Sequence, residues 1–410
     1  MATTGLVDQN YDAIIVGARI AGSATALGLA ARGWRVLLLD AATFPSDTLS
    51  THLLWSDALA GFDRLGVLDA VLAVGAPALT RVQLAFGDVQ NSAPIPTRPG
   101  YPPLLSVRRI VLDDILARRA GVAAGVTLRE GSGVEQLCWE HGRVSGVRGV
   151  RRATGERFAA RAPVVVGADG RHSLVARQVN AAAYDVVPPL LATYYRYYRG
   201  VPPLTPPALE AYRDVAGGFC YLFPCDGDLW TLAVAFPQAD FAAVRQDHER
   251  QLAVHLARKP GLLERLAGAE PAGPWRGAGD LANFLRVPYG PGWALAGDAG
   301  YHRDPITARG ISDALLTAEL LAAALDRAWR GALPYGEALH AYQLGRDAAI
   351  RPLYDFTVDR PPAGVAPTAW SAYLARAFTD PDFLSVYIGF MAAVTPPSAF
   401  YTASAVLGSA

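Results

Sequence analysis

The sequence has few cysteines: Cys138, Cys220 and Cys225 are the only three in 410 residues. An odd, widely scattered set makes no disulfide framework and lacks metal-ligand spacing. The sequence also has no histidine–glutamate metal cluster and no nucleophile elbow. We therefore expect reduced, structural thiols and no bound metal, and the hydrolase and metalloenzyme classes are not favoured.

Long apolar runs are missing too. Gly, Arg or Asp interrupts every apolar segment well before the ~18 residues that a membrane span needs. Residues 1–10 are polar and lack the basic region of a secretory signal. We expect a soluble, cytoplasmic protein without a membrane partner.

Net charge is absent as well, because Lys+Arg and Asp+Glu are 37 each. This balance gives no electrostatic reason to expect nucleic acid as a partner. The chain does have 51% apolar residues, 40 glycines and 30 prolines. That composition and length predict a globular protein of two interleaved domains with many tight loops.

A strand–helix–strand unit opens the chain. Residues 11–17 form an apolar run, residues 20–32 are small and helix-compatible, and residues 34–40 form a second apolar run. The turn Gly17-Ala-Arg-Ile-Ala-Gly22 lies where a dinucleotide fold brings its backbone close to a pyrophosphate. Asp40, 23 residues after Gly17, is placed like the acid that binds ribose hydroxyls.

Two further motifs each close a short apolar strand. Val166-Gly-Ala-Asp-Gly170 follows one such strand, and the stretch from Ala296 to Gly310 follows another and runs into a helix over 311–330. An aspartate at the carboxyl end of a strand can accept hydrogen bonds from ribityl or ribose hydroxyls. The free N–H groups of a helix N-terminus favour negative charge, as on the N1–C2=O edge of a reduced flavin. The three motifs together predict one dinucleotide site.

On these motifs, the chain resembles the FAD-dependent monooxygenases of the aromatic-hydroxylase type (group A flavoproteins) from about residue 11 to 330. Gly17–Gly22 is similar to the family's dinucleotide fingerprint, Asp169-Gly170 to its DG motif and Gly297-Asp298 to its GD motif. Arg108-Arg109 resembles the run holding an arginine near the FAD pyrophosphate, and either residue fits. The resemblance implies FAD as bound cofactor and NAD(P)H as transient electron donor. The cofactor-binding residues that it implies are Gly17, Arg19, Ala21, Gly22, Asp40, Arg108, Arg109, Asp169, Gly170, Gly297, Asp298, Pro305, Gly310 and Ile311.

Several positions depart from the family pattern. Arg19 replaces the middle glycine of the fingerprint, so its side chain must point away from the phosphates or lie along them as a counter-ion. Tyr301 stands where the family usually has histidine, and Ser312 replaces a frequent asparagine. The loop 44–52 resembles that of the geranylgeranyl-reductase-like flavoproteins, which reduce isolated double bonds. These departures leave the reaction subtype open.

The predicted fold is α/β: a Rossmann-like FAD-binding domain interleaved with a mixed or antiparallel β-sheet substrate domain, followed by a helical C-terminus. Segments 126–128, 133–139 and 143–150 are expected to be strands of one meander. The predicted boundaries are 1–75, 106–182 and 291–330 for the FAD-binding parts, 76–105 and 183–290 for the substrate domain, and 331–410 for the C-terminal region.

Aromatic, β-prone runs between 183 and 290 suggest a substrate pocket. We expect an apolar, aromatic pocket whose candidate walls are Tyr194, Tyr221, Phe223 and Trp230. His52 and Tyr221 are the candidate catalytic residues, with His52 as a proton shuttle facing the flavin. A lone loop histidine is more often solvated or a helix cap, and Asp304 and Asp313 are interpreted only as turn or helix caps.

The leading functional hypothesis, by resemblance, is a monooxygenase. NAD(P)H would reduce FAD, O₂ would add at C4a, and the peroxyflavin would oxygenate an apolar or aromatic, polyketide-like secondary metabolite. A flavin-dependent C=C reductase or dehydrogenase is the alternative within the same class. A non-redox FAD-bound cyclase is the alternative from another class. The choice between NADH and NADPH, and the need for a separate flavin reductase, stay open.

Overall fold

A computed structural model describes residues 11–214, 218–361 and 365–401. Residues 1–10, on which the expected lack of a secretory signal partly rested, lie outside the described residues, as does the end of the predicted C-terminal region, 402–410. The described chain is a mixed α/β protein, which confirms the predicted fold class.

A six-stranded sheet organises the first half of the fold. Its spatial order is β20 (Tyr289–Gly290), β21 (Trp293–Leu295), β11 (Val164–Gly167), β1 (Ala13–Val16), β2 (Val36–Leu39) and β7 (Val126–Arg129). All neighbours are parallel except β20 and β21. Parallel pairing brings the carboxyl ends of β1, β11 and β21 to one edge, where ligands bind in open α/β sheets.

Both faces of this sheet are covered, which explains why its strands are apolar throughout. Ala13 and Ile15 of β1 pack toward the helices α1 (Ile20–Ala30), α4 (Arg109–Gly121) and α9 (Gly310–Trp329). Ile14 and Val16 pack on the opposite face against a three-stranded sheet. That sheet has the order β10 (Arg157–Arg161), β9 (Arg143–Arg151) and β8 (Ser132–Glu140).

The expected meander over 126–150 is partly wrong. Strands β8 and β9 do form an antiparallel pair, but β7 pairs in parallel with β2 at the edge of the six-stranded sheet. Gly125, just before β7, has a φ of +87°, and its carbonyl accepts a hydrogen bond from Val36 N–H. A short apolar segment does not reveal which sheet it joins, because alternation alone carries no partner information.

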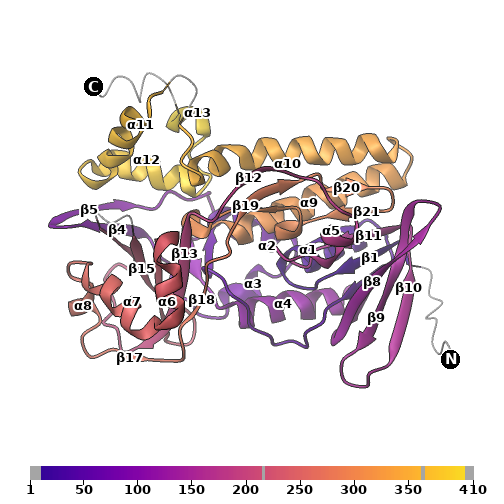
Figure 1. The fold of residues 1–410 in the computed structure, drawn as a ribbon, viewed down its shortest axis with the longest axis horizontal. Helices are drawn as coiled ribbons and strands as arrows, with labels where there is room; N and C mark the ends of the chain where they lie inside the picture. The colour runs from indigo at the N-terminus through magenta and orange to yellow at the C-terminus, as the bar shows by residue number, and fades with distance from the viewer. Residues whose placement is uncertain (1–10, 215–217, 362–364, 402–410) are drawn as a thin grey trace.

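An eight-stranded, mostly antiparallel sheet forms the second half (Figure 1). Its order is β17 (Glu270–Pro271), β13 (Leu191–Arg199), β16 (Trp230–Pro237), β15 (Phe219–Pro224), β14 (Ala208–Arg213), β4 (Arg81–Phe86) and β5 (Val89–Pro94), with β18 (Arg276–Ala278) also paired to β13. Only β14 and β4 run parallel. The helices α6 (Phe241–Gln246), α7 (His248–Ala257) and α8 (Leu262–Arg265) cover one face.

Smaller elements join the two halves. These are β12 (Ala183–Val187), β19 (Asn283–Arg286) and β22 (Tyr301–His302) in one sheet, β3 (Leu53–Trp55) and β6 (Leu104–Ser106) in another, and the helices α2 (Ser56–Arg64), α3 (Leu68–Leu72) and α5 (Leu174–Gln178). The long helix α10 (Tyr335–Thr357) runs beside α9 toward the eight-stranded sheet (Figure 1). The helices α11 (Pro367–Ala375), α12 (Pro381–Met391) and α13 (Pro397–Phe400) then pack against β4 and β5 in an aromatic-rich cluster.

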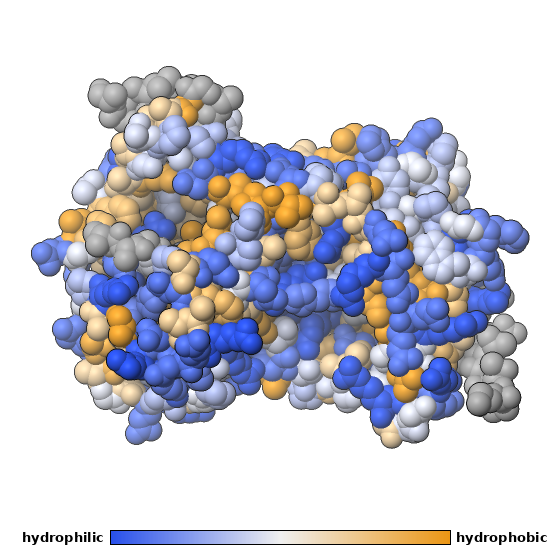
Figure 2. Space-filling view, in the orientation of Figure 1, coloured by the Kyte–Doolittle hydropathy of each residue, from blue (hydrophilic) through white to orange (hydrophobic). Residues whose placement is uncertain are grey.

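The face of the molecule drawn in Figure 2 carries both hydrophilic and apolar areas. Hydrophilic side chains cover much of this face, and an apolar patch lies above its centre (Figure 2). No helix in the described ranges combines the length and apolarity that crossing a bilayer requires.

Candidate functional site

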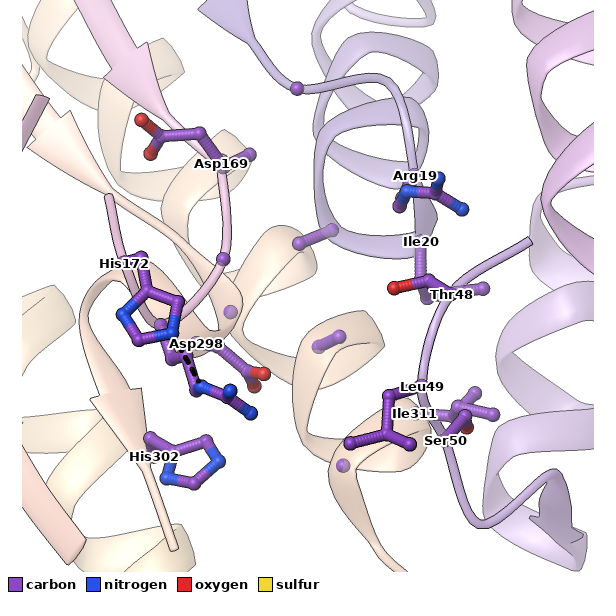
Figure 3. A pocket seen from close by; sticks show the side chains of 18 of the residues that line it. Arg19, Ile20, Thr48, Leu49, Ser50, Asp169, His172, Asp298, His302 and Ile311 are labelled. Atoms are coloured by element: carbon purple, nitrogen blue, oxygen red, sulfur yellow. Dashed lines mark hydrogen bonds between the residues drawn. The ribbon is translucent and has the colours of Figure 1, made fainter. Parts of the chain in front are cut away.

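The three sequence motifs meet at one cavity of about 570 Å³. Gly17 follows β1, Asp169 follows β11 and Asp298 follows β21, so three adjacent parallel strands deliver them to the same edge. The predicted residues that line the cavity are Gly17, Arg19, Ala21, Asp40, Arg109, Asp169, Gly170, Gly297, Asp298, Pro305, Gly310 and Ile311. Figure 3 shows Asp169, His172, Asp298 and His302 on one side of it and Arg19, Ile20, Thr48, Leu49 and Ser50 on the other.

Two groups of lining residues are distinguished below. The turn side consists of Gly17, Arg19, Ala21, Asp40, Arg109, Asp169, Gly170, Gly297 and Asp298. The sheet side consists of Thr193, Tyr195, Ala233, Arg303 and Asp304.

Glycine is required in the first turn by close backbone packing. Gly17 has a φ of +101°, and a Cβ there would lie 2.4 Å from the Ala168 carbonyl oxygen. A Cβ on Gly22 would lie 1.7 Å from the Gly17 carbonyl oxygen. Gly22 therefore does not line the cavity but allows helix α1 to start directly against the turn.

Asp40 holds the first turn in shape. Its Oδ2 accepts a hydrogen bond of 2.7 Å from Ala18 N–H, and its Oδ1 accepts one of 2.7 Å from Ala42 N–H. The carboxylate also lines the cavity, so its remaining lone pairs face the place expected for a ribose.

Arg19 and Arg109 share one buried carboxylate. Asp113 of α4 is fully buried and lies 2.5 Å from Arg19 Nη1 and 2.9 Å from Arg109 Nη2. Arg19 also donates to the Ser46 carbonyl oxygen at 2.9 Å, which ties the loop after β2 to the turn. Two cations on one carboxylate leave a net positive charge at the N-terminus of α1, where a pyrophosphate would be stabilised.

Arg108 points elsewhere. Its guanidinium lies 2.7 Å from Asp226, and its backbone N–H donates to the same carboxylate at 2.7 Å. It does not line the cavity, whereas Arg109 does. The sequence left these two arginines open, and the structure brings only Arg109 to the motifs.

Asp169 and Asp298 each follow a strand of the parallel sheet but differ in burial. Asp169 Oδ2 accepts a hydrogen bond of 2.7 Å from Leu174 N–H, while Oδ1 is buried without a partner among the described residues. Burial raises the pKa of Asp169 although these N–H bonds oppose it. Asp298 is exposed toward the cavity. Gly297, with a φ of +58°, lets that turn approach Ala21 of α1.

The N-terminus of α9 opens into the same space. No side chain caps its first turn, and a Cβ on Gly310 would meet no protein atom within 4 Å. Gly310, Ile311 and Pro305 all line the cavity. The uncapped N–H groups can therefore stabilise negative charge on a ligand in front of the helix.

These residues fit FAD. Close-packed glycine turns suit a pyrophosphate, Asp40 and Asp298 suit hydroxyl groups, Asp169 Oδ1 has an unused acceptor, and the open α9 terminus suits the polar edge of an isoalloxazine ring. Fold and cavity together define an FAD-binding protein.

The comparisons with known proteins agree. Residues 10–186 match the family described as FAD binding domain. The tryptophan 2-halogenase of Chondromyces crocatus is 25% identical over 335 residues, covering 80% of this chain and 64% of that protein, just under two thirds of its length. The digeranylgeranylglycerophospholipid reductase of Methanocella arvoryzae is 24% identical over 368 residues, 86% of each.

Solved structures share the fold. The flavin-dependent brominase Bmp2 superposes with a TM-score of 0.82 at 20% identity, covering 98% of both chains. PqsL from Pseudomonas aeruginosa, a probable FAD-dependent monooxygenase, gives a TM-score of 0.73 at 21% identity over 93% of this chain and 99% of that one. Residues 10–186 are thus matched by an FAD binding domain, which gives FAD as the cofactor. The whole chain shares its fold with flavin-dependent halogenases and monooxygenases.

The sheet side differs from the expected aromatic pocket. Tyr195 and Ala233 are direct cross-strand partners on β13 and β16, and Thr193 lies two residues from Tyr195 on the same face. The predicted walls Tyr194, Tyr221, Phe223 and Trp230 are not among the residues that line the cavity. Tyr194 alternates to the opposite face of β13, where it stacks on Phe236, because successive strand residues point to opposite faces.

His52 lies behind this wall rather than in it. It is fully buried, its Nε2 lies 2.7 Å from the Tyr197 hydroxyl, and its ring meets Tyr195 edge-on at 4.9 Å. Burial, with Arg109 nearby, lowers the pKa of His52 to about 3. The ring is therefore neutral at physiological pH, and its role as a proton shuttle stays a prediction.

Tyr221 is also away from the cavity wall. Its hydroxyl donates to the Ile306 carbonyl oxygen at 3.4 Å, which supports the loop between β22 and α9 from outside. Burial raises its pKa well above the usual range. Its catalytic assignment likewise stays a prediction.

The sequence reasoning missed the polar residues of the sheet side. Arg303 and Asp304 come directly before Pro305 in the third motif, and both are buried at the cavity. The short helix that follows Asp304 has no side-chain cap hydrogen bond of good geometry, and Asp313 pairs with Arg303 at 2.9 Å. Two adjacent charged residues inside a cofactor motif were the available signal. No group of three or more potential metal ligands occurs in the described part of the chain.

Proposed function

We propose that this protein is a monooxygenase that uses NAD(P)H and O₂ to oxygenate an aromatic or polyketide-like small molecule. The observation that carries the proposal is the single cavity that joins the turn side to the sheet side. A substrate resting against Thr193 and Tyr195 would share one cavity with the cofactor. Bound FAD and substrate would together have to keep water from the reacting atoms, as oxygen transfer from a flavin requires.

The protein's own residues supply position and charge. The turn side would hold the pyrophosphate and ribityl chain, with Arg109 rather than Arg108 near the phosphates. The N-terminus of α9 would stabilise negative charge on the reduced ring. FAD, when bound, supplies the electron- and oxygen-transfer chemistry. We assign His52 and Tyr197 to holding the Tyr195 wall in place.

Halogenation is the second candidate. Arg303 Nη1 and Arg309 Nε are buried N–H donors at the cavity with no hydrogen-bond partner among the described residues, although Arg309 Nε lies 3.9 Å from the Asp313 carboxylate. Two such donors suit a halide ion. The tryptophan 2-halogenase and the brominase Bmp2 named above are both halogenating enzymes by their names. The two candidates differ in whether product formation depends on bromide or chloride.

The visible spectrum of the holoprotein under NADPH without oxygen is the first test. Bleaching of the flavin, recovery in air, and substrate-linked oxygen uptake with an oxygenated product support the monooxygenase. A product carrying bromine only when bromide is present supports the halogenase. Reduction of a substrate C=C bond without oxygen uptake contradicts both. A flavin that no donor reduces points to a non-redox role, and one that bleaches only with an added flavin reductase identifies a two-component system.

A further inference from the structure

Asp304 is a buried carboxylate without a matched partner. Its residue is 2% exposed, it lines the cavity, and neither oxygen has a hydrogen-bond partner of good geometry among the described residues. Its own backbone N–H donates to Asn283 Oδ1 at 2.7 Å, which fixes the main chain while leaving the side chain free of that bond. A buried carboxylate with unused acceptors is costly unless a ligand satisfies it.

The surroundings keep this carboxylate close to its titration point. Burial raises the pKa of Asp304 to about 7, although the backbone N–H groups of Leu191 and Ile306 favour the ionised form. The adjacent Arg303 does not neutralise it, because Arg303 Nη2 pairs with Asp313 at 2.9 Å. Arg309 likewise pairs with Asp57.

The other titratable groups near this end of the cavity come from four elements. They are Tyr195 on β13, Tyr221 on β15, His302 on β22, and Arg303, Arg309 and Asp313 along the loop and the first turn of α9. Burial raises the pKa values of both tyrosines, and arginine stays charged in proteins. His302 Nδ1 lies 2.7 Å from the Ala282 carbonyl oxygen.

We propose that Asp304 binds an O–H or N–H group of the substrate and accepts its proton, so that the substrate is an aromatic ring carrying a phenolic hydroxyl or a ring N–H. This inference rests on the proposed oxygenase function and names its substrate class. Thr193 and Tyr195 would place the ring against the sheet side. They lie on β13 together with Leu191, whose backbone N–H is near the Asp304 carboxylate. The unpartnered Arg303 Nη1 is a donor for a carbonyl or carboxylate on the same substrate.

The proton transfer balances within one turnover. The substrate O–H bond breaks, the proton moves to an Asp304 oxygen, and the electron pair stays on the substrate oxygen and spreads into the ring. That ring is then a stronger nucleophile toward the electrophilic oxygen that reduced FAD and O₂ supply. After oxygen transfer, the attacked ring carbon loses its hydrogen as a proton to solvent. The substrate oxygen regains its proton from Asp304, which restores the carboxylate.

Ligand binding to the holoprotein tests this without turnover. The probes are 4-methylphenol and its O-methyl ether, which differ only in the hydrogen-bond donor, and the readout is the change in flavin absorbance. Between pH 6 and pH 8 the affinity for 4-methylphenol should rise about tenfold, as a carboxylate with a pKa of about 7 becomes ionised. The ether should bind more weakly at pH 8, with no such rise.

Asp304→Asn should abolish the rise, because the amide keeps the shape and cannot ionise. Asp226→Asn is the matched control: Asp226 is equally buried but is paired with Arg108 away from the cavity, so the rise should persist. The flavin spectrum checks the folding of each variant. The phenol–ether comparison in the unmodified protein decides the question even if a variant fails to fold.

A rise that persists in Asp304→Asn overturns the inference. The same rise for the ether, or no detectable binding of 4-methylphenol up to its solubility limit, overturns it as well. Because binding is read without O₂ or NADPH, these outcomes are distinct from a failure of the oxygenase function.

Discussion

The turn side and the sheet side of the cavity are built differently. On the turn side, Asp40 accepts two backbone N–H bonds, and the arginines Arg19 and Arg109 share the Asp113 carboxylate, so that Asp169 Oδ1 is the one buried acceptor of this side without a partner among the described residues. On the sheet side, neither oxygen of Asp304 has a hydrogen-bond partner of good geometry among the described residues, and the same holds for Arg303 Nη1. A site whose groups satisfy one another is ready for one fixed ligand, whereas unpartnered buried groups are stable only when a ligand completes them. The contrast separates cofactor recognition from substrate recognition within one space.

The largest expected effect is at the turn side. Gly22→Ala would place a Cβ 1.7 Å from the Gly17 carbonyl oxygen, so α1 cannot start against the turn. We expect an almost complete loss of bound FAD, measured as the ratio of flavin to protein absorbance. Gly345→Ala is the control, because its Cβ meets no atom within 4 Å in the exposed face of α10, and it should add roughly 1 kcal/mol of stability. Full FAD occupancy in Gly22→Ala would show that the backbone of the turn side can shift to accommodate a Cβ, and would contradict a rigid cofactor site.

The next effect tests whether the turn side is electrostatically complete. Asp113→Ala removes the carboxylate shared by Arg19 and Arg109 and leaves two partly buried cations facing each other. We expect the free energy of unfolding to fall by about 3 kcal/mol in urea titrations. Asp114→Ala, next along α4, removes an exposed pair with Arg118 and should cost less than about 1 kcal/mol. Equal losses in the two variants would argue that the buried network adds nothing.

The same contrast explains what could be predicted from the sequence. Gly17, Asp169 and Asp298 were found because a glycine turn after an apolar strand is encoded by adjacent residues, and parallel strands then bring the turns together. The sheet side depends on which face of β13 meets the cavity, and a shift of one residue separates Tyr195 from Tyr194. The burial of Asp304 could not be predicted from the sequence either, because an aspartate before a proline is typical of a surface turn. Arg108 and Arg109 are neighbours in the sequence, but Arg109 lines the cavity and Arg108 pairs with Asp226. Helix α4 begins between them, and the sequence does not fix that position to one residue.

His52 provides a test on the sheet side through pH. Its pKa is about 3 in the folded protein and near 6.5 when unfolded, so below pH 6.5 the unfolded chain binds the proton that the folded chain refuses. Stability should therefore fall as pH drops from 7 to 5, by about 2 kcal/mol from this residue alone. His52→Asn, which tolerates the φ of +61°, should flatten that slope while lowering stability at pH 7. His340→Asn, on the exposed face of α10, should leave the slope unchanged, and an unchanged slope in His52→Asn would contradict the buried, neutral assignment.

The smallest effect separates two neighbouring arginines. Arg109→Gln removes a cation from the cavity wall, and the Kd for FAD should rise about tenfold, or about 1.4 kcal/mol, when apoprotein is titrated by flavin fluorescence. Arg108→Gln should leave the Kd for FAD within about twofold. It should instead lower the free energy of unfolding, because Asp226 is buried and loses its guanidinium partner. The pair of variants thus trades affinity against stability, as expected if one arginine serves the cofactor and the other the fold. Weaker FAD binding in Arg108→Gln than in Arg109→Gln would contradict the assignment of the pyrophosphate to the N-terminus of α1. It would also contradict the proposed difference between the turn side and the sheet side.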